Sequence, residues 1–212
     1  VPLPQSGQLR PEPLTAISAS TNSIIQNNTS SDDLTFIKDT QPNALSVYSR
    51  GTMALGGSLY NGISPVPAGA GGAVSITNAG SVSSTVGAGI YAVSAGNLQV
   101  DGGPSGKGGA VTIVTSGDVT GDKGGIVAIS QGGMSTIQGY LHTPGFGGGA
   151  AGGTVAVTVS GSANVTANGT GPAVFAASYG GNARYQPNPF GPYLYGGSGG
   201  KGGSARVTLG SQ

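Results

Sequence analysis

The segment GGAVSITNAGSVSSTVGAGIYAVS (Gly71–Ser94) decides the predicted fold, because the chain repeats it. It recurs as GGAVTIVTSGDVTGDKGGIVAIS (Gly108–Ser130) and, with a longer middle, as GGTVAVTVSGSANVTANGTGPAVFAAS (Gly152–Ser178). A further copy begins at Gly202 with GGSARVTLG, and a degenerate copy of the last part is LSVYS (Leu45–Ser49). Repeats of this size indicate units that stack on their neighbours and share one continuous core.

The spacing divides each repeat into a constant part and a variable part. From the first glycine to the serine that ends each copy, the chain advances 23, 22 and 26 residues. From that serine to the next Gly-Gly pair it advances 14, 22 and 24 residues. Insertions that collect at one point of a repeat indicate a loop on one face of a stack.

Each constant part predicts three short strands. Val, Ile, Thr and Ser alternate with small residues at the period of two that strands require, and Gly interrupts every candidate helix. The first copy has strands near Val74, Val82 and Ile90, with Gly or Asn at the corners to supply positive φ. The predicted fold class is therefore all-β: a right-handed parallel β-helix (solenoid) with Gly/Pro/Tyr-rich loops.

Two sets of residues express the predicted register. The serine that ends each copy should pair with its equivalents, about 4.8 Å apart in neighbouring parallel strands; this set is Ser49, Ser94, Ser130 and Ser178. Alternate apolar residues of the first strand should line the interior; this set is Val74, Ile76, Val111, Ile113, Val155 and Val157.

The chain divides into two predicted regions. Residues 45–212 form the β-helix repeats, and residues 1–44 form an extended, proline-rich arm and an irregular N-terminal segment. Within that segment, residues 16–18 and 34–37 are candidate strands. Because the chain begins at Val1 without an initiator methionine, we expect a processed form or a fragment of a longer protein.

Composition excludes several classes of protein. Charged residues make up 7% of the chain, against roughly 25% in an ordinary soluble domain, and the net charge is +1. Such a chain presents no basic surface for nucleic acid or for an anionic membrane. No apolar run approaches the length of a membrane span, so we expect no direct membrane insertion by this segment. The absence of Cys is compatible with passage through an oxidising compartment.

The last strand of the repeat carries a recognisable phrase. Gly89-Ile90-Tyr91-Ala92-Val93-Ser94 and Gly125-Ile126-Val127-Ala128-Ile129-Ser130 resemble the Gly-Ile-x-Ala-x-Ser phrase of Gly-rich autotransporter passenger domains. The stretch VSITNAGSV (Val74–Val82) is similar to the strand pair that precedes it in that family. The resemblance covers roughly residues 45–210. It implies a secreted or surface-displayed β-helical stalk of the bacterial cell, in adhesion or biofilm roles.

The residues that could carry chemistry are few and scattered. His142 is the only histidine, so no metal cluster is expected. Of the seven carboxylates only Asp118 and Asp122 share a repeat, and both fall at turns, where backbone hydrogen bonding explains them. We therefore expect no catalytic residue, no cofactor, no metal and no enzyme activity. A polysaccharide-active β-helix enzyme, the least favoured alternative, would need several acids on one face.

The variable loops concentrate aromatic residues among glycines and prolines. If successive loops leave the same edge, these rings gather on one face and can contact a glycan or a surface protein; the candidates are Tyr140, Phe146, Tyr185, Phe190, Tyr193 and Tyr195. The alternative is that the loops pack back on their own strands and cover the outer sides of Val127, Ile129 and Phe175.

Taken together, the sequence predicts a non-catalytic structural or adhesive protein of the cell surface or extracellular space. A glycan-binding module that uses the Tyr-rich loops is the alternative. The repeat beginning at Gly202 is unfinished, and an open edge of this kind favours association. We expect head-to-tail self-association into a stalk or filament, in which residues 15–49 of one subunit add strands to the Gly203–Leu209 edge of the next.

Overall fold

The computed structural model describes residues 14–18, 24–28, 34–36, 43–51, 68–97, 99–100, 104–137, 148–185 and 199–210. All regular secondary structure within these ranges is β-strand, and every listed strand pair is parallel. The strands form four sheets, in which each strand pairs with its equivalent from the neighbouring repeat.

Three sheets form the body of the molecule. In pairing order, sheet A consists of β1 (Leu14–Ser18), β4 (Leu45–Arg50), β7 (Ala88–Ala95), β11 (Gly124–Gln131) and β15 (Val174–Tyr179). Sheet B consists of β2 (Ile24–Asn28), β5 (Val74–Asn78), β9 (Val111–Thr115), β13 (Val155–Val159) and β17 (Ala205–Leu209). Sheet C consists of β3 (Leu34–Phe36), β6 (Val82–Ser84), β10 (Val119–Gly121) and β14 (Val165–Ala167).

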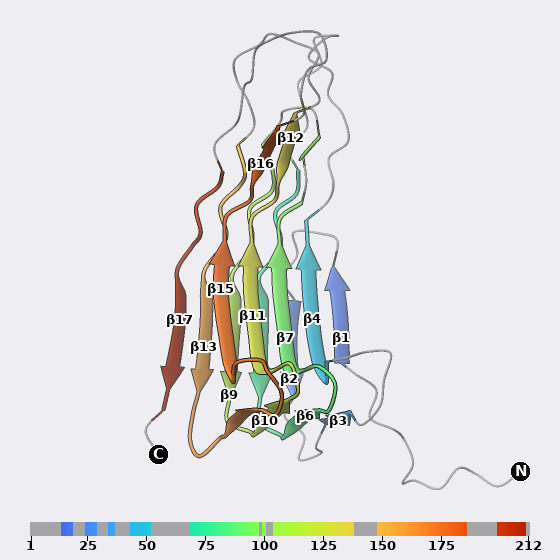
Figure 1. Cartoon of the computed structure of the whole chain (residues 1–212), viewed down its shortest axis with the longest axis vertical. Coiled ribbons are helices and arrows are strands. Elements are labelled where there is room, and N and C mark those ends of the chain that lie inside the picture. Colours follow the sequence, from blue (N-terminus) through green and yellow to red (C-terminus); the bar gives the residue numbers. More distant parts are fainter. Residues whose placement is uncertain are drawn as a thin grey trace, which may run out of the picture.

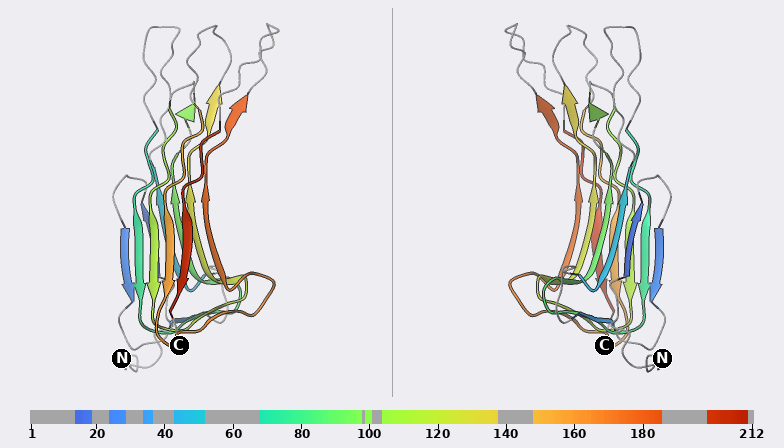
Figure 2. Two further views of the ribbon diagram at one scale, coloured as in Figure 1. Left: turned by 90° about the vertical axis from the view of Figure 1, so that its left-hand side faces the viewer. Right: turned by 90° about the vertical axis from the view of Figure 1, so that its right-hand side faces the viewer.

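The chain visits these sheets in the same order in every repeat. It runs along a sheet A strand, returns in the opposite direction along sheet B and crosses the short sheet C strand to the next unit (Figure 1). Sheets A and B form two long layers, and sheet C lies at one end of them (Figure 2). The all-β, parallel and repeating architecture predicted from the sequence is therefore present.

The fourth sheet was not predicted. Sheet D consists of β8 (Gln99–Val100), β12 (Ser135–Ile137) and β16 (Ala183–Tyr185), and it follows the sheet A strands at the end of the molecule opposite sheet C (Figure 1). Its residues fall where we expected the variable loops to begin. The stacking of repeats thus continues for a few residues beyond the constant part.

The core lies between the sheets and follows the predicted alternation. Strand β9 has the burial order buried, exposed, buried, exposed, buried, as a strand with one interior face requires. All six residues expected to line the interior are at most 1% exposed. They join the apolar residues of sheets A and C in one cluster that includes Leu45, Val47, Ile90, Ile126, Val82 and Val119.

The predicted serine register is also confirmed. Ser49, Ser94, Ser130 and Ser178 are direct partners in successive strands of sheet A, and Ser18 of β1 extends the series. Strands β1, β2 and β3 pair with β4, β5 and β6 in the register of the later repeats. They lie upstream of residue 45, where the sequence analysis starts the repeats.

The role expected for the corner glycines needs correction. Within the described residues only Gly124 and Gly161 have positive φ, at 151° and 66°. Gly161 makes a sharp corner with open space around it, as expected. Most other glycines are required by close approach between repeats. A Cβ on Gly109, for example, would overlap the backbone carbonyls of Gly71 and Gly72 in the preceding repeat.

Replacing Ile113 by Asp tests the interior assignment. Ile113 is 0% exposed in the middle of sheet B, so its replacement places an unpaired carboxyl among aliphatic side chains. We expect the free energy of unfolding to fall by about 4 kcal/mol or more. Thr112→Asp, which puts the same group on the exposed neighbouring position of β9, is the matched control. Equal denaturation midpoints for the two variants would contradict the assignment.

Candidate functional site

The Gly-Gly pair and the serine of each repeat meet in one continuous series of hydrogen bonds. We call it the serine–glycine ladder; its members in order are Ser49, Gly72, Ser94, Gly109, Ser130, Gly153, Ser178 and Gly203. Ser94 shows the rule, because its Oγ donates to the carbonyl of Gly72 (2.7 Å) and accepts from the amide of Gly109 (2.9 Å). Each inner serine thus joins two consecutive repeats.

The ladder explains why the first residue of each pair is also glycine. A Cβ on Gly108 would lie 2.5 Å from Ser130 Oγ and 2.8 Å from the carbonyl oxygen of Gln131. The same contact with the ladder serine arises at Gly71 and Gly152. Any side chain would push the strand of sheet B away from the serine and break the ladder.

A second polar contact lies inside the coil at the corner between sheets B and C. The buried Asn78 donates from Nδ2 to Thr115 Oγ1 (2.9 Å) and to the carbonyl of Gly80 (2.8 Å). Thr115 in turn donates to the carbonyl of Gly117 (2.8 Å). These side chains satisfy corner carbonyls, so their role is structural.

The outer face of sheet A is the most apolar part of the described surface. Its residues alternate with the buried ones, and Tyr91, Val127 and Phe175 are neighbours in register. Phe175 is 37% and Tyr179 46% exposed, while Tyr48 and Tyr91 are half-buried. Burial raises the pKa of the Tyr91 hydroxyl, and the nearby Tyr48 raises it further.

The outer faces of the other two long sheets differ in chemistry. Thr77, Val114, Thr158 and Thr208 are partners along sheet B, and Ser83, Thr120 and Thr166 are partners along sheet C. Hydroxyl groups therefore dominate there, and rings are confined to sheet A. The sequence analysis did not single out Tyr48 and Tyr91. A large residue at a variable position of the Gly-Ile-x-Ala-x-Ser phrase was the available signal.

Most of the candidate contact residues fall outside the described part of the chain. Tyr140, Phe146, Phe190, Tyr193 and Tyr195 are among the residues whose structure is not described, as is His142. Tyr185 is the last residue of β16, one of the sheet D strands from which the variable loops continue. The prediction that these rings gather on one face stays a prediction.

The two carboxylates that share a repeat have structural partners. Asp118 Oδ1 accepts from the backbone amide of Asn164 in the next repeat at 2.7 Å, and from its side-chain amide at 3.3 Å. We expected a turn within one repeat, but this bond joins two repeats. Asp122 forms an ion pair with the adjacent Lys123 at 3.3 Å, and Lys123 is largely exposed. An exposed ion pair of this kind contributes little to stability.

The described residues contain no group of three or more His, Cys, Asp or Glu side chains able to hold a metal ion. Across the same residues, no helix has the length and apolar character needed to cross a membrane.

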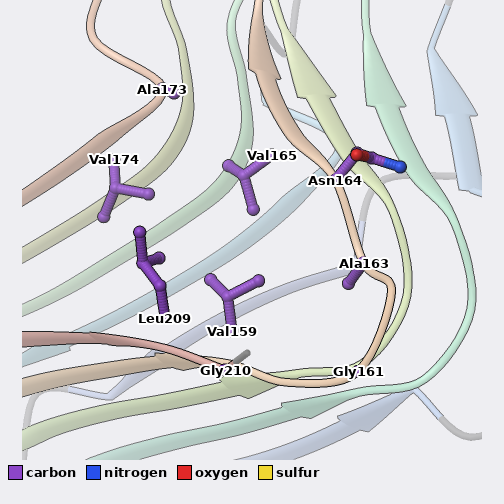
Figure 3. Close-up of a pocket in the computed structure, with 9 residues that line it drawn as sticks. All are labelled: Val159, Gly161, Ala163, Asn164, Val165, Ala173, Val174, Leu209 and Gly210. Carbon is purple, nitrogen blue, oxygen red and sulfur yellow. The ribbon is translucent and has the colours of Figure 1, made fainter. Parts of the chain in front are cut away.

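The C-terminal end of the coil contains a cavity of about 290 Å³. The side chains of Val159, Val165, Val174 and Leu209 converge on it from sheets A, B and C, and the Asn164 amide points away from it (Figure 3). Its apolar lining continues the core toward the open end, without the acids, bases or nucleophiles of a reaction centre.

Comparisons of the chain with protein-family models, with curated proteins and with solved structures found no match. The resemblance to autotransporter passenger repeats therefore rests on the residues quoted above.

Replacing Ser94 by Ala tests the serine–glycine ladder. The change leaves the carbonyl of Gly72 and the amide of Gly109 without their hydroxyl partner. We expect the free energy of unfolding to fall by about 1–3 kcal/mol. Ser116→Ala, the same change at an exposed corner, is the control. Chemical denaturation of both variants measures the difference, and equal stabilities would show that the ladder contributes nothing.

Proposed function

We propose that this chain forms a right-handed parallel β-helix that serves as a non-catalytic structural or adhesive segment of a secreted or surface-displayed protein. The observation that carries the proposal is the serine–glycine ladder, which passes through successive repeats without interruption. A structure in which every unit is bonded only to its neighbours can be lengthened without changing any contact. That property suits a stalk.

Surface chemistry supports the same proposal. The net charge is +1, and hydroxyl and small side chains dominate the outer faces of sheets B and C. Such faces interact weakly with nucleic acid and with anionic membranes. The resemblance of the repeat phrase to autotransporter passenger domains adds the expected place, outside the bacterial cell, and the adhesion or biofilm role.

Lengthening the coil tests the stalk. The segment Gly108–Ala151 begins at one Gly-Gly pair and ends before the next, so copies of it can be inserted in tandem before Gly152. We expect four inserted copies to lengthen the stack by about 19 Å, at 4.8 Å for each added strand, without loss of stability. Crystallography or solution scattering measures the length, and denaturation measures the stability. Inserted copies that fail to fold would contradict the proposal.

A glycan-binding surface is the second candidate, and the rings on sheet A favour it. Phe175 and Tyr179 are exposed, and aromatic faces with few charges near them can stack on sugar rings. Under this alternative a panel of neutral cell-wall glycans binds the protein, and Phe175→Ala or Tyr179→Ala weakens binding. Thr158→Ala on the outer face of sheet B is the control.

An assay for polysaccharide cleavage separates both candidates from an enzyme. Because Asp118 and Asp122 each have a structural partner, we expect neither to carry a reaction. Uronate polymers incubated with the protein should remain uncleaved, with and without added divalent metal. A cleavage activity that disappears in Asp118→Asn or Asp122→Asn, while the fold is retained, would overturn this expectation.

A further inference from the structure

The coil presents one unpaired edge at β14, β15 and β17, the last strands of sheets C, A and B. In earlier repeats the first amide of each sheet B strand donates across to the next repeat, as from Val111 to Thr154 (2.9 Å) and from Val155 to Ser204 (2.8 Å). Ala205 occupies the next equivalent position, and no described residue accepts from its amide. This edge therefore offers backbone donors for a further strand.

The serine–glycine ladder reaches the same edge. The carbonyls of Gly72, Gly109 and Gly153 each accept from the serine of the following repeat. Gly203 is the last glycine of the ladder, and no hydroxyl among the described residues donates to its carbonyl. A serine in the register of Ser178 on an added strand would supply the missing donor.

The apolar core is also open at this edge. Val207 is 44% and Leu209 68% exposed, whereas Val157 and Val159, their partners in β13, are buried. The cavity at the C-terminal end of the coil lies beside Leu209 (Figure 3). Exposed aliphatic residues that continue a core are typical of a surface that another element covers.

The opposite end of the coil carries a complementary edge. Strands β1, β2 and β3 pair on one side only, with β4, β5 and β6. Ser18 holds the ladder position in β1, because its register partner is Ser49. Leu14, Ile24 and Leu34 hold the positions of the interior residues Leu45, Val74 and Val82.

We propose that the edge formed by β14, β15 and β17 binds a second copy of this chain through its β1, β2 and β3. The argument is continuity, because the contact repeats the parallel stacking already present between each pair of neighbouring repeats. In this arrangement Ser18 of the second copy faces Ser178, and Leu14, Ile24 and Leu34 face Val174, Ala205 and Val165. The proposal names a partner for the stalk and rests on the β-helix proposed above.

The register also limits the strength of the contact. Gln26 and Asn28 of the second copy fall opposite Val207 and Leu209, so two polar residues meet two aliphatic ones. Burying a polar side chain against aliphatic ones is unfavourable, and we therefore expect association to be reversible. The two edges are unlike, so the contact is heterologous and repeats without closing, which produces filaments.

Two variants on β17 test the edge. We expect the mass of the 212-residue protein in sedimentation to rise with concentration. Val207→Lys, which places a charge inside the contact, should weaken association about tenfold or more. Thr208→Lys adds the same charge on the outer face of the same strand and should leave association unchanged. A strictly monomeric parent protein would overturn the proposal, as would equal effects of the two variants.

Disulfide cross-linking tests the register, since the chain has no native Cys. Residues 17 and 177 share one register column but lie four strand spacings apart in one molecule, about 19 Å. A disulfide cannot span that distance, so Ile17→Cys with Ala177→Cys should form bonds only between molecules. We expect a series of cross-linked oligomers on mild oxidation.

The matched control combines Ile17→Cys with Thr158→Cys, on the outer face of sheet B. Equal cross-linking of the two pairs would overturn the proposed register. A native chain whose own further residues form the next repeat on this edge would overturn the proposal itself. In each of these cases the insertion experiment on Gly108–Ala151 still tests the stalk separately.

Discussion

The hydrogen bonds of the serine–glycine ladder are the constraint on which the rest of the structure depends. Each inner serine hydroxyl bonds backbone groups of two successive repeats, so it fixes where sheet B lies relative to sheet A. Because strand side chains alternate with a period of two, a shift by one residue would turn every interior side chain outward. The ladder therefore selects the register in which Ile76, Ile113 and Val157 are buried.

This constraint accounts for much of the composition. The ladder requires that two backbones approach closely at every Gly-Gly pair, and a Cβ at Gly108 or Gly152 would meet the serine oxygen. It imposes no condition on the chain between the end of sheet D and the next pair. That stretch can vary in length because loop closure costs little extra free energy as a loop grows. Glycine content and loop variability thus have a common origin in the stacking of repeats.

The stacking also explains why function, where the surface carries one, belongs to faces and edges. The interior is filled by small aliphatic residues, and the polar groups at its corners are bonded, as Asn78 is to Thr115 and Gly80. Asp118 likewise holds the next repeat through Asn164. What distinguishes one side of the coil from another is the set of outward residues, aromatic on sheet A and hydroxylic on sheets B and C.

The sequence by itself determined the repeat, the strands of the constant part, the interior residues and the partnership of Ser49, Ser94, Ser130 and Ser178, because these follow from periodicity and fixed spacing. Only the tertiary structure decided the rest. Strands β1 to β3 and sheet D have no repeat phrase of their own and acquire their register from the neighbouring repeat. The glycines are required mainly by contact between repeats distant in sequence, the outer rings of Tyr91 and Phe175 become neighbours only when strands pair, and the open edge exists only once the coil is built. In each case the deciding contact joins residues that local sequence patterns do not connect.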